Sequence, residues 1–532
     1  MQYRPLASRF VAVSSVLVLG FGIGLTMHKY KYFPYRHVQG MARLLIGVAN
    51  PASVSLDSQY SLDPKRPALH RRVDTGLLPL TVHGIRVSEE HRFPKGGGAV
   101  TTIGESVVIV DRLGNFYAYR SSAESIEKLR MPALPNDIEK YVARVGALRI
   151  NERTFRAYDL LYIPSRREIA VSHEMFDSNG GTTRLAVSLL SIDQNTLEPT
   201  GKWNTIFLGD LEPDGSNEQG GGALALKGSD KLHVALGDYG EVDLVADPAS
   251  TFGKTFEVDL TSGQRRLFSQ GHRNPQGMFT LNNGDIIEVE QGPYGGDELN
   301  VLRADSNYGW PKVSLGTDYG TYDIGSRPGD HSGYAQPLFS WVPSIGVSSV
   351  IQLQRFDARW KGDLLVTSLK GESLFRLRLA DGHVQYSEPI FLGQRIRDVT
   401  EAASGTVVAW TDDAQLLVLT VDAARLTSDS RNGPLKGGTV EAECLYCHHF
   451  GPTGPSDFAP SLSGLFHRRI ASDNFRYSDA LRSRDEVWTE ESLRAFVSNP
   501  AEFAEGTAMP RRHLEDDQLD EVIAALKAAS YQ

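Results

Sequence analysis

The sequence predicts an all-β propeller followed by a small all-α domain, with an apolar helix at the N-terminus. Short runs rich in Val, Ile, Leu and aromatic residues, separated by Gly, Asn and Asp turns, fill residues 81–422. Helical periodicity is nearly absent there and returns only after residue 437. A chain of 532 residues also exceeds the size at which one hydrophobic core keeps growing, so at least two folded units are expected.

The apolar run at the N-terminus is the first element in chain order. Residues Phe10–Met27 carry no charge and would span roughly 27 Å as a helix, close to the hydrocarbon thickness of a membrane. The run ends without the small residues of a signal-peptidase site, which favours an uncleaved anchor over a signal peptide. Arg4 and Arg9 before the run are matched by Lys29 and Lys31 after it, so flanking charge leaves the orientation open.

The strand-like runs of the middle segment have similar lengths. Val107–Asp111 and Phe116–Arg120 lie on either side of a Leu-Gly-Asn turn, and Lys231–Asp238 and Thr255–Leu260 are later examples. So many short strands of similar length imply a closed all-β architecture, and a propeller fits this pattern best. No strict repeat period is visible, so this pattern leaves the number of blades open.

Helical signals mark the last part of the chain. Thr489 is placed to cap a helix through Val497, which stops before Pro500. Apolar residues recur at helical spacing near the C-terminus, at Leu519, Val522, Ile523 and Leu526. The expected boundaries are an anchor over residues 1–35, a linker over 36–80, the propeller over 81–422, a second linker over 423–436 and the helical domain over 437–532.

Charge and cysteine content exclude some functions. The 55 Lys and Arg against 65 Asp and Glu give a net charge of -10 without any basic tract, so no nucleic-acid partner is expected. The two cysteines, Cys444 and Cys447, are too few and too close for a disulfide framework from which a compartment could be inferred.

Both cysteines belong to a CxxCH motif that ends at His448. This spacing puts two thiols one helical turn apart, so both can add to the porphyrin vinyls while the adjacent imidazole reaches the iron. A zinc site would need a second ligand pair at zinc spacing, and none follows. A redox CxxC would need a βαβ context, which is missing. The motif therefore predicts a covalently bound haem c with Cys444, Cys447 and the iron ligand His448.

The surroundings of the motif resemble class I, mitochondrial-type cytochrome c from about Gly437 to Ala529. The matching pieces are residues 459–466, residues 477–480, Trp488 and the Gly-Thr-Ala-Met-Pro run at 506–510. The resemblance implies that Met509 is the second iron ligand, and a thioether ligand raises the potential of the haem. It also implies that Tyr477 and Trp488 contact a haem propionate and that the Pro460 carbonyl bonds the His448 ring. His449, His467 and His513 are alternatives for the sixth iron position.

The cytochrome resemblance bears on the compartment as well. In that family, haem is attached outside the cytoplasmic membrane of bacteria. We therefore expect a single-pass protein of the inner membrane, with most of the chain in the periplasm.

Three motifs in the β segment resemble the soluble glucose dehydrogenase and sorbosone dehydrogenase family. They are Gly271–Gly277 (GHRNPQG), Glu290–Glu298 (EQGPYGGDE) and Asn307–Pro311 (NYGWP). The resemblance is strong from about Lys231 to Asp413. It implies a six-bladed propeller that holds pyrroloquinoline quinone (PQQ) and calcium at one end of its axis.

A quinone with three carboxylates needs several cations, and polarising its ortho-quinone needs a hard metal. The resemblance places PQQ contacts at Arg273, Asn274, Ser344, Lys370, Arg395 and Arg397. It assigns the calcium ligands to the backbone carbonyls of Gly292 and Pro293. Glu298 and the backbone of Tyr308 match a second calcium site.

The chain departs from the family at the catalytic base. Gln219 stands where the family has the His that takes the proton of the substrate hydroxyl, and a neutral Gln cannot act as a base. Glu218, the preceding residue, could be recruited instead, and His173–Glu174 in an earlier blade is a second choice. A further family Gln is not recognisable near Tyr158. The part of the site that holds the cofactor is kept, and the part that abstracts the proton is altered.

Two functions follow as alternatives. The first is a membrane-anchored periplasmic PQQ-dependent oxidoreductase that oxidises a sugar or alcohol and passes electrons to its own haem and then to a respiratory acceptor. The second is a non-catalytic, degenerate propeller that serves as a binding or assembly module for an electron-transfer cytochrome c. A third possibility is that a different small ligand occupies the propeller axis.

Overall fold

The computed structural model describes residues 70–85, 95–120, 125–145, 155–212, 218–317, 330–423, 448, 460–472, 475, 477–507, 509, 514 and 516–530. The expected anchor, Cys444 and Cys447 lie outside these residues, as do His449 and His513. Within the described residues, no helix has the length and apolar character needed to cross a membrane.

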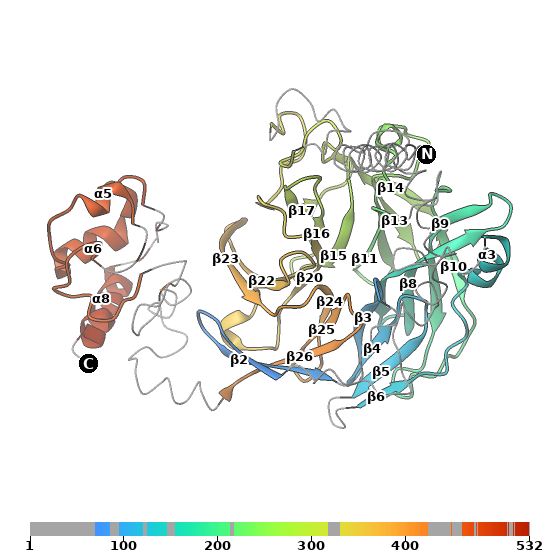
Figure 1. The fold of residues 1–532 in the computed structure, drawn as a ribbon, viewed down its shortest axis with the longest axis horizontal. Coiled ribbons are helices and arrows are strands. Elements are labelled where there is room, and N and C mark those ends of the chain that lie inside the picture. The colour runs from blue at the N-terminus through green and yellow to red at the C-terminus, as the bar shows by residue number, and fades with distance from the viewer. Residues whose placement is uncertain are drawn as a thin grey trace, which may run out of the picture.

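Six sheets are arranged around a common axis, and their strand pairs are antiparallel except for one short parallel pair in blade three (Figure 1). Blade one consists of β3 (Ala99–Ile103), β4 (Ser106–Val110), β5 (Phe116–Arg120) and β6 (Ser125–Lys128). Blade two consists of β7 (Ala157–Ile163), β8 (Glu168–Asp177), β9 (Thr182–Ser191) and β10 (Asn204–Leu208). Blade three consists of β11 (Gly221–Lys227), β12 (Lys231–Leu236), β13 (Lys254–Asp259), β14 (Arg265–Gln270) and the short β18 (Ser306–Asn307). Blade four consists of β15 (Pro275–Thr280), β16 (Ile286–Glu290), β17 (Asp297–Leu302) and β19 (Phe339–Trp341). Blade five consists of β20 (Val347–Gln352), β21 (Leu364–Ser368), β22 (Ser373–Ala380) and β23 (His383–Phe391).

The sixth blade joins strands from both ends of the propeller. It consists of β24 (Ile396–Glu401), β25 (Val407–Thr411), β26 (Leu416–Val421), β2 (Pro79–Ile85) and β1 (His70–Asp74). Strand β2 pairs antiparallel with β26 from Leu80↔Val421 to Ile85↔Leu416. The first strands β3, β7, β11, β15, β20 and β24 contact one another in sequence, and β24 contacts β3 again. The closed six-bladed propeller is therefore confirmed.

The start of the propeller differs from the sequence-based expectation. Strand β1 begins at His70, inside the segment 36–80 that we expected to be a linker. The reason is that β1 is an edge strand with the sequence HRRVD, whose arginine-rich run lacks the apolar pattern of the inner strands. Its partner β2 buries Leu80 and Val82 against blade five.

The core is divided among the contacts between successive blades. Separate clusters of buried aliphatic and aromatic side chains fill each of the six spaces between neighbouring blades. Strands β4, β21 and β25 are buried at every position because both of their faces are covered. This explains why the sequence shows continuous apolar runs there and not an alternating pattern.

A buried ion network helps to hold blade five against blade six. Arg376 on β22 has no exposed surface and donates to Glu388 at 2.8 Å and to Asp363 at 3.0 Å. Its guanidinium carbon lies 4.9 Å from the ring centre of Trp360. Glu388 also accepts a hydrogen bond from the backbone N–H of Gly76, in the turn between β1 and β2. The network thus connects blade five to the strands that close the ring.

Outside the blades, the described residues of the propeller include α3 (Ile138–Val145) and the 3₁₀ turns Val242–Leu244 and Ala358–Trp360. The C-terminal domain contains α5 (Asp479–Arg482), α6 (Glu490–Ser498), α7 (Pro500–Phe503) and α8 (Asp516–Ser530), around a core of its own. Thr489 caps α6 through a reciprocal bond with Ser492, as the sequence predicts. Pro500 ends α6 but also begins α7, because proline suits the first turn of a helix.

Replacing Arg376 by Ala should lower the free energy of unfolding of the propeller by about 3–5 kcal/mol, because it leaves buried carboxylates with less charge compensation. Urea unfolding followed by tryptophan fluorescence measures this change. Arg120→Ala, which removes an exposed pair with Glu127, is the control and should change stability by less than about 1 kcal/mol. Equal effects of the two variants would contradict the structural role of Arg376.

Candidate functional site

The connections at one end of the propeller gather the expected site residues. In an antiparallel blade, the first strand begins at the end where the second strand finishes. Residues just before β11, β15, β20 and β24, and those just after β12, β16, β21 and β25, therefore share one end of the axis. The expected residues at these connections are Glu218, Gln219, Arg273, Asn274, Gly292, Pro293, Ser344, Lys370 and Arg395, with Arg397 inside β24.

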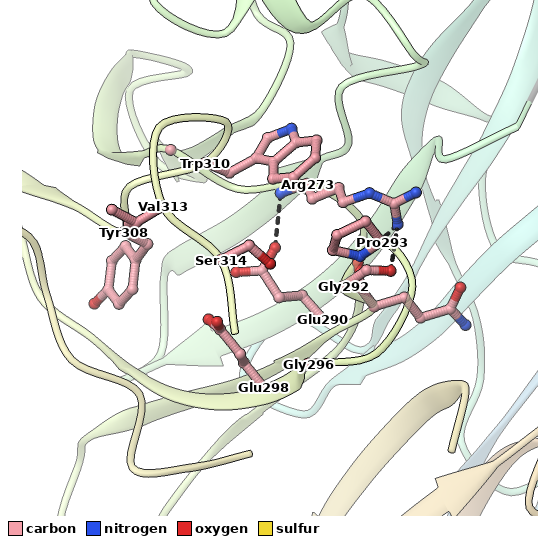
Figure 2. A pocket seen from close by; sticks show the side chains of 12 residues that line it. Arg273, Glu290, Gly292, Pro293, Gly296, Glu298, Tyr308, Trp310, Val313 and Ser314 are labelled. Atoms are coloured by element: carbon pink, nitrogen blue, oxygen red, sulfur yellow. Dashed lines mark hydrogen bonds between the residues drawn. The ribbon is translucent and has the colours of Figure 1, made fainter. Parts of the chain in front are cut away.

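A small cavity lies among these loops (Figure 2). Its walls come from the β14–β15 connection, the β16–β17 connection and the segment after β18. The lining residues are Gly271, Arg273, Glu290, Gln291, Gly292, Pro293, Gly296, Glu298, Tyr308, Trp310, Val313 and Ser314. Both pairs of expected calcium ligands, Gly292 with Pro293 and Glu298 with Tyr308, therefore line the same cavity.

Arg273 is the central cation of the cavity. Its Nη1 donates to the carbonyl oxygens of Gln291 at 2.9 Å and Gly292 at 2.8 Å. The guanidinium carbon lies 5.4 Å from the ring centre of Trp310, which donates through Nε1 to Asp238 at 2.8 Å. The carbonyl that we expected to bind calcium thus already accepts a cationic donor.

Asn274 and Ser344 fix the loops around Arg273. The Oδ1 atom of Asn274 accepts from the backbone N–H of Gly221 at 3.2 Å, and its Nδ2 donates to Gln291 at 3.1 Å. The Ser344 hydroxyl donates to the buried Asp297, which also accepts from the N–H of Gly292 at 3.1 Å. Asp297 therefore joins the Gly292–Pro293 loop to the start of blade five.

Arg395 and Arg397 share one carboxylate, Asp412, after β25. Burial would raise the pKa of Asp412, but the charges and hydrogen bonds of Arg397 and Arg395 hold this pKa at about 2. Lys370 is exposed and forms no ion pair within the described part of the chain. This end of the axis thus holds the cationic side chains of all four basic residues expected to contact PQQ, Arg273, Lys370, Arg395 and Arg397.

The turn at Gln219 shows what surrounds the position of the family base. Gln219 has a left-handed φ of 60°, and its buried Oε1 accepts no hydrogen bond from the residues that the structure describes. Its neighbour Glu218 is exposed. A Cβ on Gly220 would lie 2.6 Å from the hydroxyl of Tyr158 and 3.1 Å from that of Tyr239. Two tyrosine hydroxyls therefore lie against the backbone beside Gln219.

Tyr158 and Glu174 form a buried pair behind this turn. The Tyr158 hydroxyl donates to Glu174 Oε1, and Glu174 is 1% exposed. Burial and the charge of Glu174 raise the pKa of Tyr158 well above its usual value, so its hydroxyl is protonated. The Arg156 guanidinium carbon lies 5.0 Å from the Tyr158 ring centre. The sequence named Glu174 only as a second choice and gave no role to Tyr158, because only the β7–β8 pairing brings them together.

His173 is not available as a base. It is 1% exposed, and its Nε2 lies 3.0 Å from the Ser188 hydroxyl while Nδ1 lies 3.0 Å from the Glu174 carbonyl. Burial lowers the pKa of His173 to about 4, so the ring is neutral near pH 7.

The C-terminal domain holds the other group of expected residues. His448 Nδ1 lies 2.8 Å from the Pro460 carbonyl, the contact that the resemblance implies. Trp488 is buried and stacks on Phe503 with ring centres 5.7 Å apart, while Tyr477 and Met509 pack against the same core. His467 is exposed.

Comparisons with known proteins match the propeller and the C-terminal part separately. Residues 163–419 match the Glucose / Sorbosone dehydrogenase family model. The chain is 31% identical over 215 residues to an aldose sugar dehydrogenase of Escherichia coli, covering 36% of this chain and 57% of that protein. It is 30% identical over 246 residues to an uncharacterized protein of Synechocystis sp., covering 41% of this chain and 59% of that protein. The chain thus spans somewhat more than half the length of these propeller relatives.

Solved structures show the same fold. A glucose dehydrogenase aligns with a TM-score of 0.54 at 24% identity, over 64% of this chain and 99% of the other. The soluble aldose sugar dehydrogenase of Escherichia coli, in its apo form, aligns with a TM-score of 0.54 at 22% identity, over 64% and 99%.

Relatives of the C-terminal part are cytochromes. Cytochrome c2 of Blastochloris viridis is 33% identical over 111 residues, which cover 20% of this chain and 87% of that protein. Cytochrome c2 of Rhodospirillum rubrum is 34% identical over 103 residues, covering 17% and 92%. The chain therefore combines a six-bladed propeller with a C-terminal part that belongs to the cytochrome c family. Residues 163–419 of the propeller resemble the Glucose / Sorbosone dehydrogenase family.

Asp238 beside the cavity gives a prediction for pH dependence. Burial raises the pKa of Asp238 to about 6. The charge of Arg273 and the hydrogen bonds from the Gly240 N–H and the Trp310 ring act in the opposite direction, but burial outweighs them. The native state therefore keeps a proton that the unfolded chain releases above about pH 4, and the unfolding free energy falls as pH rises from about 4 to 6. Asp238→Asn should remove up to about 3 kcal/mol of that fall.

Urea unfolding at several pH values across this window tests the prediction. The exposed Asp247 lies in the same connection, so Asp247→Asn is the matched control and should leave the fall unchanged. If the unfolding free energy of Asp238→Asn falls with pH as steeply as that of the wild type, groups other than Asp238 cause the fall.

Proposed function

We propose that the protein is a membrane-anchored periplasmic PQQ-dependent dehydrogenase that oxidises a sugar or alcohol and passes the electrons to its own haem c and then to a respiratory acceptor. The observation that carries this proposal is the convergence of Arg273, Lys370, Arg395 and Arg397 at one end of the propeller, in a chain that also contains a cytochrome c. A tricarboxylate quinone is the kind of ligand that such a set of cations suits. The names of the relatives, which include a quinoprotein glucose dehydrogenase of Acinetobacter calcoaceticus, support the same chemistry.

The cavity suits calcium as well. Gly292, Pro293 and the carboxylate of Glu298 line this cavity, so oxygen donors gather there. Carbonyl and carboxylate oxygens are the ligands that Ca²⁺ prefers. We assign the carbonyls of Gly292 and Pro293 to the calcium beside PQQ, and Glu298 with the Tyr308 carbonyl to a second calcium. PQQ, when bound, would supply the hydride acceptor.

The proton of the substrate hydroxyl needs a different acceptor, since Gln219 cannot take it. We assign this role to the pair of Tyr158 and Glu174. The substrate hydroxyl would give its proton to Tyr158 Oη, and Tyr158 would give its own proton to Glu174 Oε1. The Tyr158–Glu174 hydrogen bond would provide the second transfer, and the Tyr158 hydroxyl lies against Gly220, next to the position of the family base.

Residues of the cytochrome domain would hold the haem. Cys444 and Cys447 would bind it covalently, His448 and Met509 would bind the iron, and Tyr477 and Trp488 would contact a propionate. The Nδ1 contact of His448 with Pro460 leaves its Nε2 for the iron. Fusion to the propeller raises the local concentration of haem near the quinone. The apolar run Phe10–Met27 would anchor the chain in the inner membrane.

One observation favours a second function. Gln219 occupies the position of the family base, which fits a propeller that keeps its ligand site without turnover and serves as a binding or assembly module for the cytochrome.

Adding aldoses or alcohols to the full chain loaded with PQQ and calcium should reduce its haem, because the quinone would be the electron donor of the iron. Visible absorption of the haem measures this reduction. Met509→Ala should slow haem reduction and lower the haem potential, because the thioether ligand stabilises ferrous iron. Quinone reduction by substrate should remain.

His467→Ala is the control for the iron ligand and should leave the haem spectrum unchanged. Binding of PQQ without haem reduction by any substrate would reject the dehydrogenase and favour the binding module.

Tyr158→Phe and Glu174→Gln should each lower the rate of quinone reduction by about 10²-fold or more, because a positioned general base contributes about 10²–10⁴-fold. Stopped-flow absorbance of the quinone measures this rate, and equilibrium titration measures PQQ affinity, which should stay unchanged.

Tyr162 lies on the same strand as Tyr158, and Tyr162→Phe is the matched control, which should keep the wild-type rate. Wild-type rates in both pair variants would exclude the pair and return the role to the Gln219 turn.

A further inference from the structure

Three buried carboxylates share one face of blade four. Glu288 and Glu290 lie on β16, and Glu298 lies on β17 opposite Glu290, while Asn300 lies opposite Glu288. Side chains two residues apart on a strand point to the same face, so all four side chains face the same way. Glu288 and Asn300 are fully buried, Glu290 is 4% exposed and Glu298 is 7% exposed. Figure 2 shows Glu290 and Glu298 side by side at the cavity.

These carboxylates have little positive charge around them. Among the described residues, none of the three forms an ion pair with a lysine or arginine. Their shared donor is the Asn300 amide, whose Nδ2 lies 3.3 Å from Glu288, 3.1 Å from Glu290 and 3.4 Å from Glu298. Buried carboxylates are costly unless a cation or a proton neutralises them. The cluster therefore requires one of the two.

The imidazole of His272 completes the cluster. Its Nε2 pairs with the Ser269 hydroxyl at 2.9 Å, and its ring stacks on Tyr308 with centres 4.7 Å apart. These contacts direct Nδ1 at the carboxylates, 3.4 Å from Glu290 Oε1 and 3.6 Å from Glu288 Oε1. Glu288 Oε1 is buried and has no hydrogen-bond partner among the described residues.

The spacing of these atoms suits one ion. Ligand atoms of His272, Glu288 and Glu290 all lie within 4.8 Å of one another. Two donors that each lie about 2.1 Å from a metal are at most about 4.2 Å apart, and both Nδ1 distances are shorter than that. One imidazole with two carboxylates is a donor set for Mn²⁺, Fe²⁺ or Zn²⁺, whereas Ca²⁺ takes oxygen ligands.

We propose that His272, Glu288 and Glu290 bind a divalent transition-metal ion, of the manganese or zinc type, inside blade four. This site uses none of the residues assigned to calcium. The Asn300 amide donates to both carboxylates, and the Ser269 hydroxyl contacts Nε2 of His272, which leaves Nδ1 for the ion.

The ion would stabilise the loop that carries Arg273 and Asn274. His272 is the residue before them, and Glu290 Oε2 accepts the backbone N–H of Arg273 at 2.7 Å. An ion held by His272 and Glu290 therefore links the β14–β15 connection to β16. Its removal should loosen this connection and lower the melting temperature of the propeller.

The test uses the purified full chain without quinone or substrate, so its result does not depend on the proposed dehydrogenase function. The chain is stripped with EDTA, dialysed against Mn²⁺, Zn²⁺ or Ca²⁺, separated from free ions and analysed by mass spectrometry, with the haem iron counted separately. We expect one Mn²⁺ or Zn²⁺ per chain with a higher melting temperature than the stripped protein, and excess Ca²⁺ should not displace it.

Glu288→Gln, which keeps shape and removes one charge, should lose this ion. Glu257→Gln is the matched control, because Glu257 also faces a buried histidine, His233 at 3.4 Å, but is neutralised by Arg266. In case Glu288→Gln does not fold, Co²⁺ bound to the wild type gives a second readout, a visible spectrum typical of nitrogen and oxygen ligands. Wild-type protein that binds no Mn²⁺, Zn²⁺ or Co²⁺, or a Glu288→Gln variant that keeps the ion, would overturn the proposal and assign protons to the cluster.

Discussion

Closure of the ring by β2 and β26 is the constraint on which the rest of the structure depends. Strand β2 leads along the chain into blade one, and β26 is the last strand of the propeller, so the pairing of these two strands holds the six sheets in a circle. The pairing fixes β24 beside β3, and thereby fixes where each first strand begins. Arg273 and Arg397 come from blades four and six, and their common position at the axis follows from closure. The Glu388–Gly76 bond holds the same junction from blade five.

Charge is distributed unevenly around the axis. Arg395 and Arg397 are paired with Asp412, so their positive charge is partly neutralised and their geometry is fixed. Arg273 donates instead to two backbone carbonyls and forms no ion pair among the described residues. Negative charge predominates on the neighbouring face of blade four, where the carboxylates of Glu288, Glu290 and Glu298 share the Asn300 amide as a hydrogen-bond donor. One end of the propeller can therefore suit both an anionic cofactor and metal cations.

Sequence predicted the parts of this protein whose signals are local. The propeller class could be predicted from continuous apolar runs such as β4 and β25. Both faces of these strands are covered, so every residue is apolar or small and the runs stand out in the sequence. The capping of α6 by Thr489 followed from a motif of four residues. The start of the sixth blade did not follow, because the edge strand β1 is polar and is recognised only through its pairing with β2. The clusters of Tyr158 with Glu174 and of His272 with Glu288 depend on strand register, which no local pattern specifies.

The altered turn at Gln219 has a steric explanation that the sequence alone did not provide. A Cβ on Gly222 would lie 2.5 Å from the Cβ of Tyr158, and one on Gly220 would lie 2.6 Å from the Tyr158 hydroxyl. Gly220 and Gly222 therefore stand where the Tyr158 ring fills the space. The same ring brings a hydroxyl that is bonded to Glu174, so a proton donor and a carboxylate lie beside the position where the family has its base. Burial of the Glu174 carboxylate is costly, and the Tyr158 hydroxyl and the Arg156 backbone N–H offset part of that cost. The proposed relocation of the proton acceptor rests on this pair.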